Sequence, residues 1–440
     1  MKFAICNLGC KVNNYESNWY RQQLSKQYQE VDFKEFSDIY IINSCTVTNM
    51  AGSKTRQMMH KARKQNPDSC IVVVGCYVQM EFDDPELFKD CDILIGSKDK
   101  TRLPELIDQF FIDGKRVTLV QNEDKYPFEE MFITDFNQIR AYLKIQDGCN
   151  QFCSYCVIPY ARGRERCLPM PLVLNQAKAL VKSGHCELVL TGIHTGRWHD
   201  GDYVFSDLVE KLVVEVEGLK RLRISSIEVT EIDDKLIELM SKNDIIAHHL
   251  HIPLQTGSDF LLKDNNRPYN SKYYIDKVNN IRNKINDISI SSDVIVGLPN
   301  ETEEYFQQTI DTIQQAHLSF LHVFPYAKKK HTVDYDKKNQ VDAKVKKERV
   351  GRLTNLSLRL YNNYAASFVG KTVDVLFEKY EKGINKGHCS QYLNVELACE
   401  IDLTNQFVKV EVISVKESTL RYFPASLTSH SADIELICNH

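Results

Sequence analysis

The chain has 440 residues, enough for more than one domain, and its 43% hydrophobic and 26% charged residues are ordinary for a globular protein. A formal net charge of -4 excludes an overall basic surface, so a polyanionic partner would have to meet a local patch. No apolar run of about 18 residues exists and Met1–Phe3 does not begin a signal peptide, so the fourteen cysteines favour metal or redox use in the cytoplasm, with no membrane, over a disulfide framework.

Residues 1–125 alternate short apolar runs with helical patterns, which predicts a parallel α/β domain. The expected strands are Lys2–Asn7, Ile39–Asn43 and Ile71–Val74, and the expected helices are Tyr15–Tyr28 and Gly52–Gln65.

A cysteine follows each of these strands: Cys10, Cys45 and Cys76. Because the carboxyl ends of parallel strands meet at one edge, the three thiols should project together. Glycine before Cys10 and Cys76 would let the backbone approach a bulky cluster closely. We expect this trio to hold a 4Fe–4S centre. The alternative is that they are buried structural thiols.

A second trio, Cys149, Cys153 and Cys156, has C-x3-C-x2-C spacing on a loop after the expected strand Arg140–Gln146. A structural zinc ion takes four closed ligands, and no fourth Cys or His follows at a usual distance. Three thiolates on a 4Fe–4S cluster leave one iron open for a small ligand. The stretch Cys149–Cys156, with Tyr155 before the last cysteine, resembles the signature of the radical S-adenosylmethionine (SAM) superfamily, in which the open iron binds SAM.

The segment 135–368 continues with five more apolar strands separated by helical patterns, which predicts a partial (β/α)6 barrel with its site at the C-terminal strand ends. The strands are expected at Glu187–Thr191, Arg221–Ser226, His249–Ile252, Ser289–Val296 and Phe320–Phe324. The helices are expected at Leu172–Ser183, Asp233–Met240, Lys272–Lys284 and Thr302–Gln315.

Polar or glycine motifs mark the ends of these strands. With Tyr155, we expect them to line a SAM pocket: Thr191, Gly192, Glu228, Gln255, Ser258, Asp293 and Val296. Glu228 has an alternative as a solvated loop carboxylate. Four histidines are possible metal ligands, but structural positions in the core or at its rim are favoured for them: His194, His248, His249 and His251.

A basic run, Lys328, Lys329, Lys330 and His331, follows the last barrel strand and precedes an expected helix over Val341–Phe368. A charge run is often only a solvated face, but its place beside the expected site favours RNA phosphate contacts. Residues 369–440 then change to short alternating strands, typical of a small all-β barrel that binds nucleic acid. Those strands are expected at Thr372–Phe377, Leu393–Ala398, Phe407–Val415 and Thr419–Phe423.

Together these motifs resemble the methylthiotransferase family of radical SAM enzymes over essentially the whole chain, and most closely the branch acting on N6-threonylcarbamoyladenosine in tRNA. The resemblance rests on Leu8–Asn13, Tyr15–Ser17, Asn43–Thr48, Gln146–Asn150 and Tyr160–Arg164. It implies an N-terminal three-cysteine domain, a radical SAM core and a C-terminal RNA-binding TRAM barrel. It also implies two 4Fe–4S clusters, on Cys10, Cys45 and Cys76 and on Cys149, Cys153 and Cys156.

The implied reaction replaces the C2–H of the adenine beside the anticodon with a methylthio group. That bond is neither acidic nor electrophilic, so the family uses a 5′-deoxyadenosyl radical from one SAM and a methyl group from a second. The implied partners are tRNA and an electron donor such as flavodoxin or ferredoxin, and the expected enzyme is a cytoplasmic monomer.

The sequence departs from the family pattern at three places: Ala327–Thr332, Cys167–Pro169 and Val229. These changes leave the cysteines intact but affect the substrate contacts. Two alternatives therefore stay open. One is a methylthiotransferase acting on isopentenyladenosine in tRNA or on a ribosomal-protein aspartate, and the other is a non-catalytic iron–sulfur RNA-binding protein.

Overall fold

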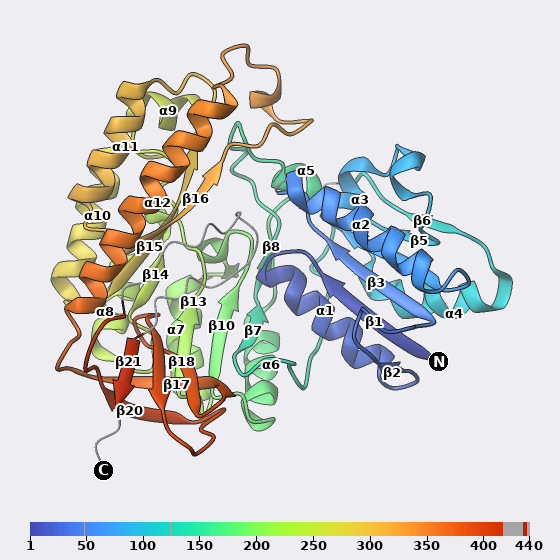
Figure 1. The fold of residues 1–440 in the computed structure, drawn as a ribbon, viewed down its shortest axis with the longest axis horizontal. Coiled ribbons are helices and arrows are strands. Elements are labelled where there is room, and N and C mark those ends of the chain that lie inside the picture. The colour runs from blue at the N-terminus through green and yellow to red at the C-terminus, as the bar shows by residue number, and fades with distance from the viewer. Residues whose placement is uncertain (48, 124, 417–433, 438–440) are drawn as a thin grey trace.

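The computed structural model describes residues 1–47, 49–123, 125–416 and 434–437. Its N-terminal part is a six-stranded parallel sheet in the order β2-β1-β3-β4-β5-β6, flanked by helices (Figure 1). The central strands β3 and β4 are buried along their whole length, which is why they read as unbroken apolar runs. The strands are β1 (Lys2–Asn7), β2 (Gln29–Glu30), β3 (Ile39–Ser44), β4 (Cys70–Gly75), β5 (Ile93–Ile95) and β6 (Val117–Leu119), and the helices are α1 (Lys11–Leu24), α2 (Asn49–Gln65), α3 (Cys76–Glu81) and α4 (Leu103–Asp113).

The middle of the chain contains two three-stranded parallel sheets in the orders β13-β10-β7 and β14-β15-β16. Isolated parallel bridges, Leu222 with Ile246 and Ser226 with His251, connect the two sheets. The strands are β7 (Ala141–Lys144), β10 (Glu187–Thr191), β13 (Arg221–Ile224), β14 (His249–His251), β15 (Ser289–Val296) and β16 (Phe320–Pro325).

Helices pack outside these strands, so that the apolar stripe of each helix covers one face (Figure 1). They are α6 (Met170–Lys182), α7 (Phe205–Glu215), α8 (Asp234–Lys242), α9 (Asp259–Asp264), α10 (Ser271–Lys284), α11 (Glu303–Gln315) and the long α12 (Ala343–Ala366). The loop with the second cysteine trio lies between β8 (Gln146–Asp147) and α5 (Ile158–Arg162), and β8 pairs with β9 (Arg166–Cys167).

The C-terminal strands form one sheet in the order β20-β17-β18-β19-β21, antiparallel except for the β19–β21 pair. Three arginines that precede or lie within core strands hold this sheet. Arg140 pairs with Glu378, Arg221 with Asp374, and Arg223 donates to the carbonyl of Cys389. The strands are β17 (Thr372–Glu381), β18 (Ile384–Cys389), β19 (Asn394–Ala398), β20 (Phe407–Glu411) and β21 (Ile434–Ile437).

The sequence-based boundaries of β1, β10 and β15 are confirmed, and other elements shift by a few residues. The first helix was wrongly expected to begin at Tyr15; it begins at Lys11, directly after Cys10. Strand β18 was missed. The expected strand Thr419–Phe423 lies outside the described residues.

Candidate active site

The N-terminal cysteines occupy equivalent positions at the ends of three neighbouring strands. Cys10 precedes α1, Cys45 directly follows β3, and Cys76 is the first residue of α3 after β4. Burial raises the pKa of the Cys45 thiol to about 12, and the neighbouring thiols of Cys76 and Cys10 add to the rise. The three thiols are therefore close enough to act on one another electrostatically. Gly75, with φ +107°, fits between the loops because an added Cβ would lie 2.8 Å from the Ser44 carbonyl oxygen.

The second trio lies on a tight loop. The Cys156 amide donates to the Cys153 carbonyl at 2.9 Å, and burial, with a contribution from Cys153, raises the pKa of the Cys156 thiol to about 12. Gly148, with φ +74°, begins the loop where a Cβ would lie 2.0 Å from the Arg164 carbonyl oxygen. A side chain at this position would push the loop away from its support.

The thiols of both trios are the donor type that iron–sulfur clusters take. Among the described residues, one group of three ligand-type side chains has ligand atoms within 4.8 Å of one another, and it is His251, Asp293 and His322, with no cysteine among them. A cluster is several ångströms across and takes more widely spaced thiolates than one ion does. Buried thiols with raised pKa values stay protonated on their own, whereas a coordinating metal removes the proton outright. The donor set therefore fits 4Fe–4S clusters.

Residues expected to contact SAM gather around Arg267. Its guanidinium pairs with Glu228 and donates to Cys153 Sγ at 3.4 Å and to the Tyr269 hydroxyl at 2.9 Å. Burial raises the pKa of Tyr155 well above its ordinary value, and Arg267 lies near enough to oppose the rise. Glu228 is therefore a paired carboxylate beside the cysteine loop, and the solvated-loop alternative is wrong.

Gln255 and Ser258 lie on the segment between β14 and α9, and Ser258 directly precedes α9. Within the described residues the Ser258 hydroxyl is fully buried and has no hydrogen-bond partner, which leaves it available to a polar ligand. Gln255 adopts φ +66°, and its amide donates to the Asp293 carbonyl at 2.9 Å. An unsatisfied hydroxyl on this segment fits a polar cofactor such as SAM.

Three other residues expected to contact SAM also have contacts within the protein. The Thr191 hydroxyl donates to the Val189 carbonyl at 3.1 Å, and Val296 is fully buried. Gly192 makes room for Gln146, whose Oε1 would lie 3.0 Å from an added Cβ. Thr191 uses its hydroxyl within the protein, and the side chains of Gly192 and Val296 carry no polar group, so any contact of the latter two with a ligand's polar groups would be made by the backbone.

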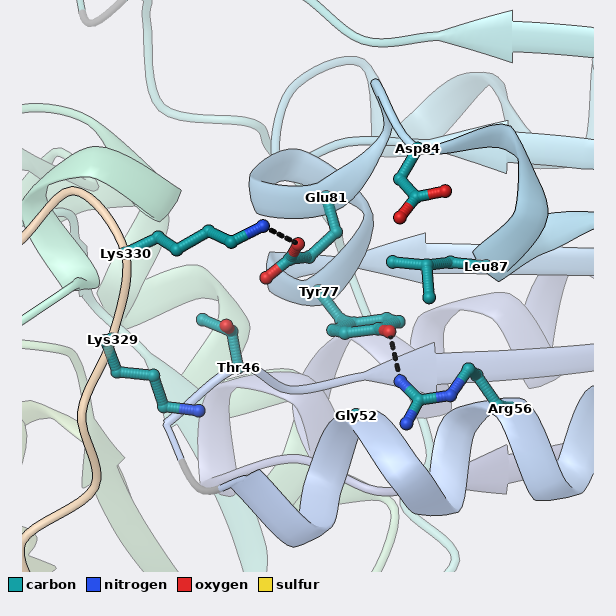
Figure 2. Close-up of a pocket in the computed structure, with 9 residues that line it drawn as sticks. All are labelled: Thr46, Gly52, Arg56, Tyr77, Glu81, Asp84, Leu87, Lys329 and Lys330. Carbon is teal, nitrogen blue, oxygen red and sulfur yellow. Dashed lines mark hydrogen bonds and ion pairs between the residues drawn. The ribbon is translucent and has the colours of Figure 1, made fainter.

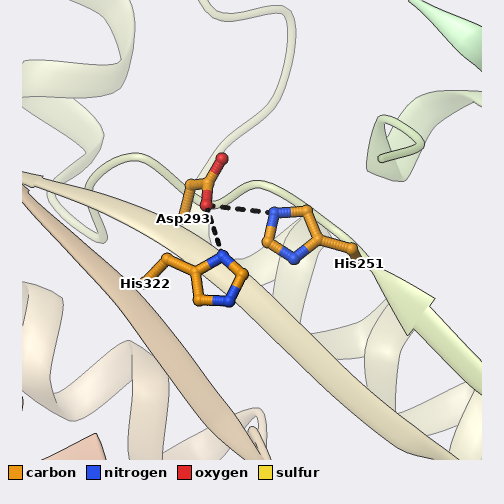
Figure 3. Close-up of side chains that lie close together, drawn as sticks. All are labelled: His251, Asp293 and His322. Carbon is orange, nitrogen blue, oxygen red and sulfur yellow. Dashed lines mark hydrogen bonds and ion pairs between the residues drawn. The ribbon is translucent and has the colours of Figure 1, made fainter. Parts of the chain in front are cut away.

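Asp293 pairs with two histidines (Figure 3). Its Oδ1 lies 3.1 Å from Nε2 of His251 and 3.2 Å from Nδ1 of His322. Although burial opposes ionisation, the two rings hold the pKa of Asp293 well below its ordinary value. The carboxylate expected to contact SAM is paired with two imidazoles on the adjacent strands, and no sequence signal singled out His322.

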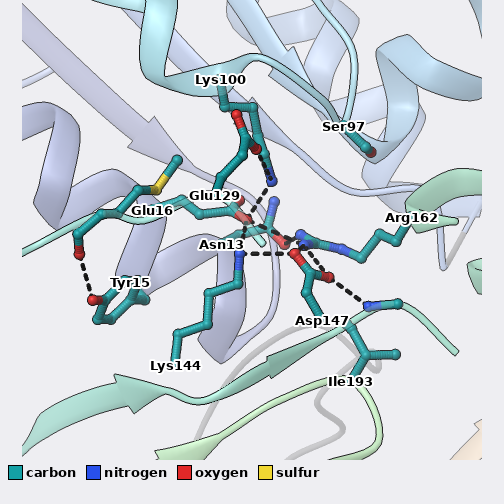
Figure 4. Close-up of polar contacts among 12 residues, drawn as sticks. Asn13, Tyr15, Glu16, Ser97, Lys100, Glu129, Lys144, Asp147, Arg162 and Ile193 are labelled. Atoms are coloured by element: carbon teal, nitrogen blue, oxygen red, sulfur yellow. Dashed lines mark hydrogen bonds and ion pairs between the residues drawn. The ribbon is translucent and has the colours of Figure 1, made fainter. Parts of the chain in front are cut away.

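A buried ionic network joins the two cysteine regions (Figure 4). Glu16 Oε1 lies 2.6 Å from Lys100 Nζ and 3.1 Å from an Arg162 nitrogen. Asp147 lies 2.7 Å from Lys144 Nζ and 3.1 Å from the same Arg162 nitrogen. All five side chains are at most 1% exposed. Sequence reasoning missed this network because its members are widely separated along the chain.

Models of two families match the chain, the radical SAM superfamily over residues 143–313 and the uncharacterized protein family UPF0004 over residues 2–96. A threonylcarbamoyladenosine tRNA methylthiotransferase MtaB of Bacillus subtilis (strain 168) is 40% identical over 93% of this chain and 93% of its own length. A tRNA-2-methylthio-N(6)-dimethylallyladenosine synthase of Finegoldia magna is 30% identical over 95% of this chain and 93% of its own length. The chain belongs to the methylthiotransferase family of radical SAM enzymes.

The fold of this methylthiotransferase is also similar to a solved radical SAM enzyme. The methyltransferase TsrM from Kitasatospora setae aligns with a TM-score of 0.56 at 13% identity, covering 76% of this chain and 77% of the other. Family membership implies that the enzyme uses SAM and a 4Fe–4S cluster. No helix in the described ranges is long and apolar enough to cross a membrane.

The basic loop of the methylthiotransferase lies against the N-terminal part (Figure 2). Lys329 and Lys330 line a cavity of about 360 Å³ together with Thr46, Arg56 and Tyr77. Lys330 Nζ is 3.7 Å from Glu81. Burial lowers the pKa of Lys329, and the neighbouring Cys45 opposes this fall. Lys328 Nζ is 4.3 Å from the Tyr335 ring centre, and His331 turns the chain with φ +68°.

Lys11 follows Cys10 and begins α1. Burial lowers the pKa of its ammonium, Arg140 and Arg223 add to the fall, and Tyr392 and Asp293 oppose it. Burial by itself raises the pKa of Tyr392, yet Arg140, Lys11 and Arg223 together lower it below its ordinary value. Lys11 therefore lies within electrostatic range of two arginines, Arg140 and Arg223.

Proposed function

We propose that this enzyme converts N6-threonylcarbamoyladenosine next to the tRNA anticodon to its 2-methylthio derivative. The observation that carries the proposal is the pair of cysteine trios, each on loops at strand ends and linked through Arg162. Relatives of the family carry this substrate in their names. The alternative of a non-catalytic iron–sulfur RNA-binding protein does not account for the loop with Cys149, Cys153 and Cys156, which fits a SAM-binding cluster.

We assign a different role to each trio. Cys149, Cys153 and Cys156 hold the cluster that binds SAM, and Cys10, Cys45 and Cys76 hold a second 4Fe–4S cluster. When bound, the clusters and SAM supply the one-electron chemistry and the methylthio sulfur that the C2–H of adenine requires. Tyr155, Glu228, Gln255 and Ser258 orient SAM.

Two of the chain's own features support this arrangement. Arg267 pairs with Glu228 and holds it beside the cysteine loop, where the carboxylate can accept hydrogen bonds from the ribose or amino group of SAM. Burial of Cys45, Cys76 and Cys153 limits the access of water to these three thiols. Exclusion of water protects reactive species from side reactions.

Lys11 favours threonylcarbamoyladenosine over the dimethylallyl substrate. The threonylcarbamoyl group ends in a carboxylate, whereas a dimethylallyl group is neutral. Within the described residues the Lys11 ammonium has no hydrogen bond or ion pair, and Arg140 and Arg223 add positive charge nearby. A cation of this kind attracts the carboxylate and offers nothing to an alkyl group.

The remaining assignments concern organisation. We propose domains at 1–125, 135–368 and 369–440, with the six core strands as a partial (β/α)6 barrel and the C-terminal sheet as a TRAM-like RNA-binding barrel. Lys328, Lys329, Lys330 and His331 contact tRNA phosphates. The enzyme acts as a cytoplasmic monomer that receives electrons from a flavodoxin or ferredoxin.

Nucleoside mass spectrometry tests the substrate. The gene for this chain is expressed in a bacterial strain that lacks its own methylthiotransferases, and total tRNA is digested and analysed. We expect 2-methylthio-N6-threonylcarbamoyladenosine to appear, and a variant with Cys149→Ala to abolish it. Appearance of the methylthio-dimethylallyl nucleoside alone would assign the neutral substrate instead.

A further inference from the structure

Arg162, at the end of α5, contacts both cysteine regions at once. Its Nε donates to Cys76 Sγ at 3.2 Å, and one terminal nitrogen donates to Asn13 Oδ1 at 3.1 Å. The same Asn13 oxygen accepts from Cys10 Sγ at 3.2 Å. Arg162 therefore reaches two of the three N-terminal cysteines, one directly and one through a shared acceptor.

The other terminal nitrogen of Arg162 binds the network that supports the second trio. It lies 3.1 Å from Glu16 and 3.1 Å from Asp147 Oδ1. Asp147 Oδ1 also accepts the Gly148 amide at 2.8 Å, just before Cys149. Figure 4 shows Arg162 reaching toward Glu16 and Asp147 from the right, whereas Lys100 comes from the top.

The buried charges of this network do not balance on their own. Lys100, Lys144 and Arg162 are cations, whereas Glu16 and Asp147 are the carboxylates that pair with them. Arg166 and Glu129 at the margin add one charge of each sign. One positive charge is therefore left over in a buried place, and such a charge is costly without a partner. The Cys76 sulfur, in contact with Arg162, is where a negative charge would offset it.

We propose that Arg162 is a positioning residue that sets the reduction potential of the cluster on Cys10, Cys45 and Cys76. This inference rests on the second cluster of the proposed function. A guanidinium N–H on a cluster sulfur stabilises the reduced form, which carries more negative charge, and so makes the potential more positive. Because the same side chain binds Asp147, it also fixes the distance between this cluster and the Cys149 loop.

The test uses the full-length chain with Cys149→Ala, Cys153→Ala and Cys156→Ala, so that only the N-terminal trio can bind iron. After anaerobic reconstitution with iron and sulfide, iron per chain is measured, and the midpoint potential is obtained by a reductive titration followed by electron paramagnetic resonance. Arg162→Gln is expected to shift the midpoint to more negative potentials. Arg162→Lys is expected to give a smaller negative shift, because an ammonium keeps the charge but loses the forked geometry.

Lys100→Met is the matched control. Lys100 pairs with the same Glu16 oxygen as Arg162 but is not hydrogen-bonded to a thiol in the described structure. It should lower thermal stability as Arg162→Gln does, while moving the midpoint much less. An unchanged midpoint in Arg162→Gln, or an equal shift in Lys100→Met, overturns the proposal.

Two further outcomes separate this inference from the function on which it rests. If the parent chain binds no iron on its N-terminal trio, the second cluster and this inference are both wrong. If the parent chain binds about four irons but the midpoint potential is the same in the Arg162 variants, the second cluster stands and the inference alone is wrong. If the Arg162→Gln variant loses its iron, the midpoint potential of Arg162→Lys is measured instead. An unchanged midpoint in Arg162→Lys then overturns the proposal.

Discussion

Arg140 Nε donates to Glu378 Oε2 at 3.0 Å and so connects the residue before the first core strand with the C-terminal sheet. His388 lies on the other carboxylate oxygen at 2.5 Å. Burial opposes ionisation of Glu378, but Arg140 and His388 lower its pKa to about 2. The ion pair therefore helps hold the proposed RNA-binding sheet against the core.

This pair predicts an acid-sensitive contribution to stability. A depressed carboxyl pKa stabilises the folded state above the unfolded value of about 4.5 and loses that contribution as the pH falls toward 2. Glu378→Gln should lower the free energy of unfolding by about 1–3 kcal/mol at pH 7 and by much less near pH 3. Urea unfolding of both proteins at the two pH values measures the difference. An equal loss at both values would contradict the assignment.

Arg267→Met is expected to weaken the SAM site. It leaves Glu228 without its cation and removes the hydrogen bond to Cys153. Losses of residues that support metal ligands cost about 10–100-fold in metal affinity or activity. Production of 5′-deoxyadenosine by the reconstituted enzyme should fall by that factor. Arg282→Met, on α10, is the control, since Arg282 donates to the Ile288 carbonyl and touches no cysteine in the described structure.

The double variant Lys329→Glu and Lys330→Glu should bind tRNA more weakly and with a weaker salt dependence. Each lost phosphate contact reduces the slope of log affinity against log salt by about 1. Filter binding at several salt concentrations gives this slope. Lys272→Glu on α10, where Lys272 pairs with Asp276, reverses one lysine charge elsewhere and should leave the slope as it is. Equal slopes in all three proteins would remove the basic loop from the RNA interface.

Lys11→Gln should reduce turnover of threonylcarbamoyl tRNA by about 10–100-fold, because the loss of one charge-assisted hydrogen bond to the substrate carboxylate has an effect of this size. Turnover is measured with anticodon stem-loops that carry the threonylcarbamoyl group and with loops whose carboxylate is esterified. The variant should lose its discrimination between the two. Full discrimination in Lys11→Gln would place the carboxylate contact at another residue. Iron content must match that of the wild type, because Lys11 is next to Cys10.

The sequence was most informative where a local pattern determines the outcome. Strands β1 and β15 have the expected bounds, and the cysteine trios follow from spacing and from strand ends. Tertiary contacts decided the rest. The helix α1 begins at Lys11 because Asn13 and Glu16 bond to Asn43 and Arg162, and Glu16 and Arg162 are 146 residues apart. Strand β18, with the sequence INKGHC, has little apolar character and gains its register from β17 and β19.

Asp293 is an example inside the site of a residue whose partners depend on tertiary contacts and not on the local sequence. Its position after a run of small polar residues in β15 indicated a carboxylate near a strand end, and this was correct. Its partners come from β14 and β16, which the sequence placed in order but not in register. Which side chains face each other across adjacent parallel strands depends on that register.

Iron content tests the central claim, that two separate cysteine trios each hold a cluster, most directly. Anaerobically reconstituted wild-type chain should contain about eight irons, and about four should remain when Cys10, Cys45 and Cys76, or instead Cys149, Cys153 and Cys156, are replaced by alanine. Four irons in the wild type that are all retained after replacement of Cys10, Cys45 and Cys76 would contradict the account.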